Sequence, residues 1–178
     1  MLGPWILCCC RDPGSLSNLR RARGVAAKPR RLEPHPIKVM KFYKAKVYQA
    51  ISTADGIGTW WDKQARTETD RGPVLEHNPG PEHGVVKLRV VELVRNQRIE
   101  WECISTHPKS SPASAWTGTH FIFELGSSSG SGHNQDRATI LEFSQAGYDE
   151  HSEFFESNKS AWGQVLQNLK QVVESQPS

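Results

Sequence analysis

The 178-residue sequence lacks any apolar run close to the roughly 20 residues that a membrane-spanning helix requires. It also lacks the glycine-rich phosphate motifs of nucleotide-binding proteins, and no Gly-Xaa-Ser-Xaa-Gly elbow occurs outside linker-like composition. We therefore expect a soluble domain with no stable membrane insertion. The missing motifs make an enzyme the less favoured class without excluding one.

Cysteine is scarce, and three of the four cysteines are contiguous. Cys8, Cys9 and Cys10 cannot form a disulfide framework or the spaced pairs of a zinc site. Cys103 stands in an alternating apolar pattern, which favours a buried small hydrophobe over a reactive thiol. A reducing compartment, and with it a cytoplasmic location, is the expectation.

Histidine occurs without the spacing of a metal motif, so we expect no metal and no cofactor. Five of the histidines fall in predicted loops or the N-terminal tail and are expected to be solvated, and His120 falls in a predicted strand, where it is expected to face solvent. The histidines are His35, His77, His83, His107, His120, His133 and His151.

The basic surplus belongs to one end of the chain. Of the 22 Lys and Arg, 7 lie in residues 1–36 with 2 of the 19 Asp and Glu, which leaves 15 basic and 17 acidic residues elsewhere. A slightly acidic body without a basic stripe lacks the electrostatic footprint of a nucleic-acid-binding protein. We expect no nucleic-acid partner.

Residues 1–36 are predicted to be a disordered basic extension, because Gly, Pro, Arg and Ser dominate and no apolar periodicity occurs. Three sharper interpretations stay open: an organelle-targeting peptide, a palmitoylated anchor at the contiguous cysteines, and an upstream translation artefact. The folded domain is then residues 37–178.

Hydrophobic periodicity predicts a strand at Ile37–Phe42, a short helix at Lys46–Ser52 and a second helical turn or two at Ile57–Trp61, after an interruption at residues 53–56. The tryptophan pair at the end of this segment is expected to plug one end of the core. From Gln64 to Ser144 the period becomes two, which predicts an antiparallel meander without helices. The predicted strands are Ala65–Thr69, Val74–His77, Gly84–Val94, Arg98–Ser105, Trp116–Leu125 and Arg137–Gln145. Residues 126–132, rich in Gly and Ser, are predicted to be a mobile hairpin loop rather than a domain boundary.

After Tyr148 the period is helical again, with an apolar stripe about six turns long. So wide an apolar face needs a large complementary surface, and the concave side of the sheet is the candidate. The expected fold class is α+β, with a curved antiparallel sheet of about six or seven strands around a long C-terminal helix. The stripe consists of Phe155, Trp162, Leu166, Leu169 and Val173.

These residues resemble the SRPBCC superfamily, also called START-like or birch-pollen-allergen-like. Within it they resemble proteins similar to the C-terminal domain of the heat-shock-protein-90 ATPase activator. The ordered matches cover essentially all of residues 37–178 and include Lys46–Ser52, Trp60–Trp61, Ile99–Cys103, Trp116–Thr119, Leu141–Tyr148 and Ser160–Trp162. The resemblance implies the helix-grip fold with a cavity between sheet and helix. It also implies a family whose members bind lipids, polyketides or other hydrophobic ligands, catalyse cyclisation, or act on a chaperone.

Nine aromatic residues and one leucine are the predicted wall of this cavity, and the plainer alternative is that they only fill the core. The residues are Trp60, Trp61, Trp101, Trp116, Phe121, Phe123, Phe143, Phe155, Trp162 and Leu166. Glu100 and Glu102 repeat on one strand face and could act as paired carboxylates, but the wet face of a half-exposed sheet is the favoured interpretation.

Three functions follow as hypotheses. The leading one is a module that binds a small hydrophobic molecule such as a lipid or polyketide. The alternatives are a co-chaperone that stimulates a heat-shock ATPase and a cyclase or aromatase. The oligomeric state is left open.

Overall fold

The computed structural model describes residues 35–40, 44–127 and 139–175. Seven strands form one antiparallel sheet in the order β1-β7-β6-β5-β4-β3-β2. The strands are β1 (His35–Met40), β2 (Ala65–Thr69), β3 (Gly72–His77), β4 (Val86–Val94), β5 (Arg98–Cys103), β6 (His120–Ser127) and β7 (Thr139–Ala146). The helices are α1 (Lys44–Ser52), α2 (Ala54–Ile57), the 3-10 helix η1 (Pro112–Trp116) and α3 (Phe155–Ser175).

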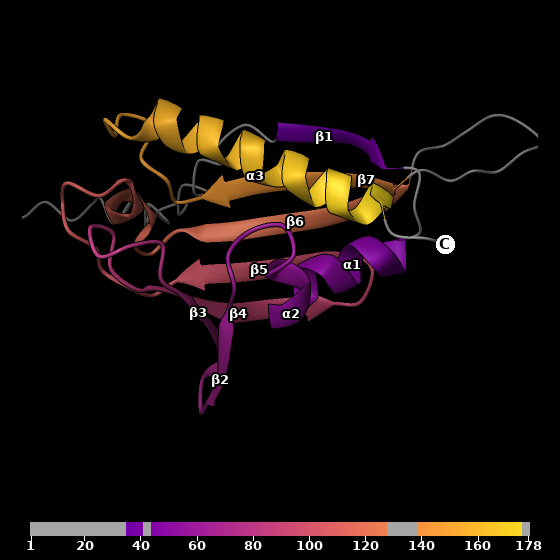
Figure 1. The fold of residues 1–178 in the computed structure, drawn as a ribbon, viewed down its shortest axis with the longest axis horizontal. Coiled ribbons are helices and arrows are strands. Elements are labelled where there is room, and N and C mark those ends of the chain that lie inside the picture. The colour runs from indigo at the N-terminus through magenta and orange to yellow at the C-terminus, as the bar shows by residue number, and fades with distance from the viewer. Residues whose placement is uncertain (1–34, 41–43, 128–138, 176–178) are drawn as a thin grey trace, which may run out of the picture.

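The long helix α3 lies across one face of the sheet over β6 and β7, and α1 and α2 lie on the same face over β4 and β5 (Figure 1). Four apolar residues of α3, Trp162, Leu166, Leu169 and Val173, are buried. The β-sheet supplies the facing layer, as in Phe121 and Phe123 of β6 and Leu141 and Phe143 of β7. This confirms the predicted α+β helix-grip architecture.

The period-two pattern predicted the central strands well, because one face of each is buried. In β5 the side chains of Ile99, Trp101 and Cys103 are at most 1% exposed, whereas Glu100 and Glu102 point to the wet face. The strand at Ala65–Thr69 has the predicted bounds. At the other edge of the sheet β1 begins at His35, two residues before the predicted start.

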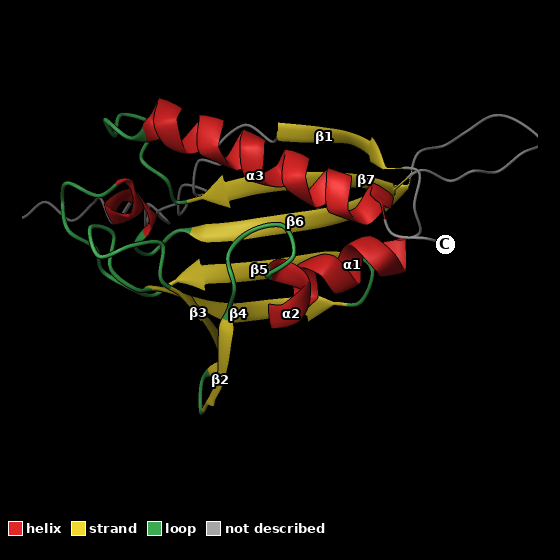
Figure 2. Cartoon of the chain, in the orientation of Figure 1, coloured by secondary structure: helices red, strands yellow, loops and turns green. Residues whose placement is uncertain are grey.

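The prediction of no helix between Gln64 and Ser144 is wrong at Pro112–Trp116, where η1 forms (Figure 2). Ser111 caps this helix, since its Oγ accepts the N–H of Ala113 at 3.2 Å, and Pro112 occupies a position in the first turn that needs no donor. The chain then turns at Gly118, whose φ is +76°. The predicted strand Trp116–Leu125 therefore starts at His120 instead.

The second helix also lies earlier than predicted. Residues 53–56 were expected to interrupt the helical pattern, but α2 begins at Ala54 because Thr53 is its N-cap, with Oγ1 accepting the N–H of Gly56 at 3.0 Å. Trp60 and Trp61 consequently follow the helix rather than belong to it. They still pack onto the core, at the start of the connection to β2.

The Gly- and Ser-rich segment connects two paired strands, because Ser127 at the end of β6 is opposite Thr139 at the start of β7. The described residues at both ends of this segment therefore lie in one sheet. Its residues from 128 on, and the predicted extension up to residue 34, lie outside the described residues. Within the part of the chain that the structure describes, no helix is both long and apolar enough to cross a membrane.

Candidate functional site

The fold brings nine of the ten predicted site residues into one apolar cluster between the sheet and α3. Phe155 is the exception: it begins α3 and its ring contacts Tyr148, with centroids 5.9 Å apart. Closely spaced rings fill the cluster, as shown by the 4.4 Å between the centroids of Phe143 and Trp162 and the 4.8 Å between those of Trp101 and Phe123.

Trp61 is the hub of this aromatic cluster. Its ring contacts those of Trp162 at 5.1 Å, Trp116 at 6.3 Å and Trp101 at 6.5 Å, measured between centroids. Its ring also meets the imidazole of His77 edge-on at 4.5 Å. Trp61 is only half-buried, and it lies in the connection between α2 and β2 and not within either element.

Four buried polar atoms at and beside this hub have no hydrogen-bond partner among the described residues: Trp116 Nε1, Trp162 Nε1, His77 Nδ1 and Gln64 Oε1. The first three belong to rings that contact Trp61. Gln64 lies beside His77, because Ala65 pairs with Glu76 across the antiparallel strands, Gln64 precedes Ala65 and His77 follows Glu76. A buried donor or acceptor without a partner costs about 1–3 kcal/mol, so such atoms rarely gather by chance.

His77 is 5% exposed and ends β3. Burial away from water lowers the pKa of His77 to about 4; the charge of Asp62 opposes this shift, and His107 adds to it slightly. The ring is therefore neutral at physiological pH. The sequence pattern does not single out His77, because Val74 and Leu75 are adjacent apolar residues and the strand shows no alternation that would place His77 on one face.

Two loop histidines that were expected to be solvated are instead half-buried and hydrogen-bonded, so that prediction is wrong for them. His107 Nδ1 donates to the carbonyl of His83 at 2.8 Å, since a carbonyl can only accept, and Nε2 is left to accept from Ser105 Oγ at 2.8 Å. His83 Nδ1 in turn lies 2.9 Å from Ser111 Oγ. This network ties together the loops at the end of the sheet where His77 lies.

Cys103 is buried as predicted, at 1% exposure. Its Sγ lies 3.5 Å from Ser105 Oγ, so it adjoins the same network. Burial raises the pKa of the Cys103 thiol, and its hydrogen bonds to Ser105 only partly oppose that rise. A protonated, buried thiol fits the structural role that the sequence indicated.

Glu100 and Glu102 lie on the outer face of the sheet, where both carboxylates are already engaged. Glu100 pairs with Arg98 and lies 2.8 Å from His120, and Glu102 pairs with Arg89. His120 is only half-buried, in line with its expected outward orientation. Burial lowers the pKa of Arg98, but its hydrogen bonds to carboxylates raise it by more. These ion pairs indicate that Glu100 and Glu102 stabilise the outer face of the sheet and are not a pair of free catalytic carboxylates.

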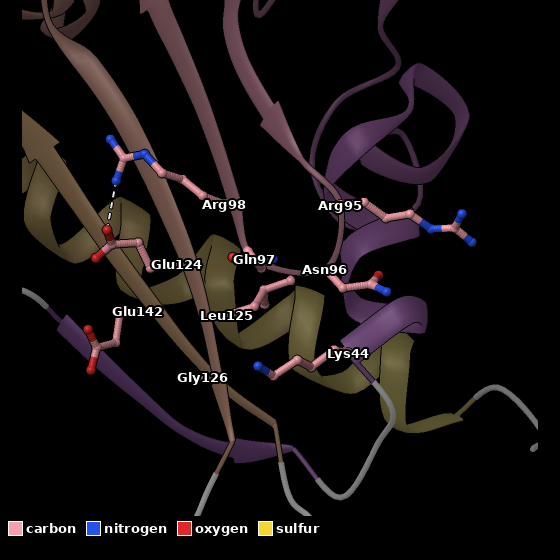
Figure 3. Close-up of a pocket in the computed structure, with 9 residues that line it drawn as sticks. All are labelled: Lys44, Arg95, Asn96, Gln97, Arg98, Glu124, Leu125, Gly126 and Glu142. Atoms are coloured by element: carbon pink, nitrogen blue, oxygen red, sulfur yellow. Dashed lines mark hydrogen bonds and ion pairs between the residues drawn. The ribbon is translucent and has the colours of Figure 1, made fainter.

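A surface hollow of about 800 Å³ lies at the β4–β5 turn (Figure 3). Lys44 of α1 points into it, Arg98 pairs with Glu124 at one side, and Arg95 points away from the sheet. None of the ten predicted site residues lines this hollow. Among residues 44–127 and 139–175, no group of three or more His, Cys, Asp or Glu is arranged to hold a metal ion.

Comparison with known proteins places this geometry in a family. The family described as "Activator of Hsp90 ATPase homolog 1-like protein" matches residues 41–174. No curated protein matches the sequence.

Several solved structures have the same fold. Aha1 of Colwellia psychrerythraea, described as a dimer in solution, is 23% identical with a TM-score of 0.62, covering 82% of this chain and 96% of that one. Protein MLL2253 of Mesorhizobium loti is 16% identical with a TM-score of 0.64, covering 84% and 100%. DynU16, from the dynemicin biosynthetic locus, is 13% identical with a TM-score of 0.56, covering 82% and 46%.

At these identities the structural likeness establishes the fold alone, and the match over residues 41–174 establishes the family. The chain belongs to the Activator of Hsp90 ATPase homolog 1-like proteins, within the SRPBCC superfamily.

Proposed function

We propose that residues 37–178 bind a small hydrophobic molecule at the aromatic cluster around Trp61. The observation that carries this proposal is the set of four buried, unpartnered polar atoms at and beside an otherwise apolar cluster. A ligand with an apolar body and a few polar atoms would bury its body among the rings and pair with these atoms. Few polar groups in a mostly apolar lining are typical of small-molecule sites.

The family match and the structural neighbours support a ligand-binding module in general terms. The ten predicted wall residues remain the proposed lining, with Phe155 at its outer end, and His77 and Gln64 are added to it from the structure. The predicted extension, residues 1–36, has its last two residues in β1, and the part before them is proposed to take no part in binding. The cytoplasm is the proposed location.

A titration followed by intrinsic tryptophan fluorescence tests the proposal, with lipids, aromatic polyketides and flavonoids as ligands. We expect at least one class to bind below about 100 μM, which corresponds to about 5 kcal/mol of binding free energy. Replacing Trp162 with Leu should weaken that binding by removing one wall, whereas Arg95→Ala in the surface hollow should leave it unchanged. Binding that responds to Arg95 and not to Trp162, or no binding at all, would reject the proposal.

A co-chaperone function is the second candidate, and the family match favours it. It predicts that the purified chain raises the ATPase rate of a heat-shock-protein-90 chaperone. An unchanged rate with saturating chain would dispose of this candidate. A cyclase-type reaction is the remaining alternative, for which His77 is the titratable group described in ring contact with Trp61.

A further inference from the structure

We propose that the indole of Trp61 occupies the place of the ligand, and that the ligand displacing it is a flat, uncharged aromatic molecule with oxygen acceptors. This inference rests on the proposed binding function. It adds the chemical class of the ligand and identifies Trp61 as the residue that the ligand displaces.

Trp61 differs from the other tryptophans of the cluster in how it is held. Trp60, its neighbour in the chain, is 3% exposed and its Nε1 donates to the carbonyl of Ala50 at 2.9 Å. Trp101 and Trp162 are 1% and 4% exposed and lie within β5 and α3. Trp61 is half-buried and lies in the connection between α2 and β2, followed by exposed residues 62 and 63. Trp116 is also half-buried, but it is the last residue of η1. Among the tryptophans of the cluster, Trp61 is therefore the one whose outward rotation disturbs the least secondary structure.

Trp61 also contacts three of the groups that carry the unpartnered atoms. Its ring packs against the rings of His77, Trp116 and Trp162, and each of these carries a buried nitrogen without a partner among the described residues. The carbon atoms of an indole cannot accept conventional hydrogen bonds from these groups. A molecule of similar shape with oxygen atoms on its rim would keep the ring contacts and supply the missing partners.

The unpartnered groups specify the chemistry of the ligand. Trp116 Nε1 and Trp162 Nε1 are donors only, so they call for acceptors such as ketone, quinone or ether oxygens. Gln64 Oε1 is an acceptor and would take a hydroxyl.

A carboxylate fits this site poorly. The cluster consists of apolar and aromatic side chains, and Asp62 lies near enough to His77 to act on its charge. An anion placed among these side chains would lose its hydration and would be repelled by the charge of Asp62. An uncharged ring ketone or phenol is therefore favoured over a fatty acid.

Three probes of one ring size isolate these features: naphthalene without a polar atom, 1-acetonaphthone with a neutral acceptor, and 1-naphthoate with a charge. Isothermal titration calorimetry would measure each against the full chain and against Trp61→Ala. We expect 1-acetonaphthone to bind most tightly and 1-naphthoate most weakly. Trp61→Ala should bind 1-acetonaphthone at least tenfold more tightly, because no ring has to be displaced.

The donor atoms are tested with a ring-preserving variant and a control outside the cluster. Trp162→Phe removes an unpartnered N–H and should lower the preference for 1-acetonaphthone over naphthalene about threefold to tenfold. Arg95→Ala changes a residue of the surface hollow, which none of the wall residues lines, and should leave that preference unchanged.

Two results would overturn the inference while leaving the binding function intact. The first is that the probes bind the full chain and bind Trp61→Ala no more tightly. The second is that 1-naphthoate binds more tightly than 1-acetonaphthone. If no probe binds either protein, both the inference and the proposed function fail for this ring class. Should Trp61→Ala unfold by circular dichroism, Trp61→Leu retains apolar packing and must still strengthen binding. The indole N–H resonance of Trp61 in the full chain must then move towards its solvent-exposed position when 1-acetonaphthone binds, and an unmoved resonance would overturn the inference.

Discussion

The buried imidazole of His77 should make the stability of this domain depend on pH in a defined window. In the folded chain the pKa of His77 is lowered from 6.5 to about 4 by burial, and in the unfolded chain it returns to about 6.5. Between these values the unfolded state binds more protons, so the free energy of unfolding rises with pH. The stabilisation is fully present above about pH 6.5 and is lost as pH falls through about 4.

The shift of His77 corresponds to about 3 kcal/mol in total, because one pKa unit is worth about 1.4 kcal/mol. About 2 kcal/mol of this lies between pH 7 and pH 5, a range above the ordinary pKa of most carboxyl groups. Urea unfolding at half-unit pH intervals, followed by circular dichroism, would measure it. The informative quantity is the difference between the parent chain and His77→Gln, in which the contributions of all other titrating groups cancel.

His151→Gln is the matched control, since this histidine is exposed. We expect His151→Gln to keep the pH dependence of the parent chain and His77→Gln to lose about 2 kcal/mol of it between pH 7 and pH 5. The reasoning from burial is refuted if the free energy of unfolding changes equally between pH 7 and pH 5 in the two variants, or if it changes by less than about 0.5 kcal/mol in the parent chain.

Two further predictions concern what holds the domain together. Leu166→Ala removes a side chain that is 0% exposed and should lower the free energy of unfolding, measured in urea, by about 2–5 kcal/mol. Gln167→Ala changes the next residue of the same helix, which is exposed, and should change the free energy of unfolding by less than about 0.5 kcal/mol. Similar losses of stability in the two variants would mean that another face of α3 is buried. Arg98→Met leaves three carboxylates of the outer face without their shared guanidinium and should cost about 1–2 kcal/mol at low salt after allowance for partial exposure. That cost should shrink as sodium chloride is added, and a cost independent of salt would contradict an electrostatic origin.

The elements that the sequence predicted best are those with one buried face. In β5 the alternation of Ile99, Trp101 and Cys103 with charged residues was enough to orient the strand, and in α3 the apolar stripe predicted the helix and its partner surface. The helix at Pro112–Trp116 was missed because a single turn contains too few residues to show a period. A Ser followed by Pro is nevertheless a capping signal, and this signal could have indicated it.

The sequence predicted the apolar residues of the candidate site but not its polar residues. Composition and periodicity pointed to nine aromatic residues and Leu166, and all of these except Phe155 meet in one cluster. The same patterns say nothing of hydrogen-bond partners, so they do not single out His77 or Gln64, and they wrongly predict solvated side chains for the loop histidines His83 and His107. Glu100 was open to two interpretations until its contacts with Arg98 and His120 were known.

By itself, then, the sequence determined the architecture, because the period of its apolar residues specifies which face of each strand and helix must leave water. Tertiary structure alone decided that Trp61 meets His77, Trp116 and Trp162, residues up to about a hundred positions away in the chain. It also decided that polar atoms at this meeting point lack partners. Whether two groups form a hydrogen bond depends on separations of a few tenths of an ångström, which emerge only when distant elements pack against one another.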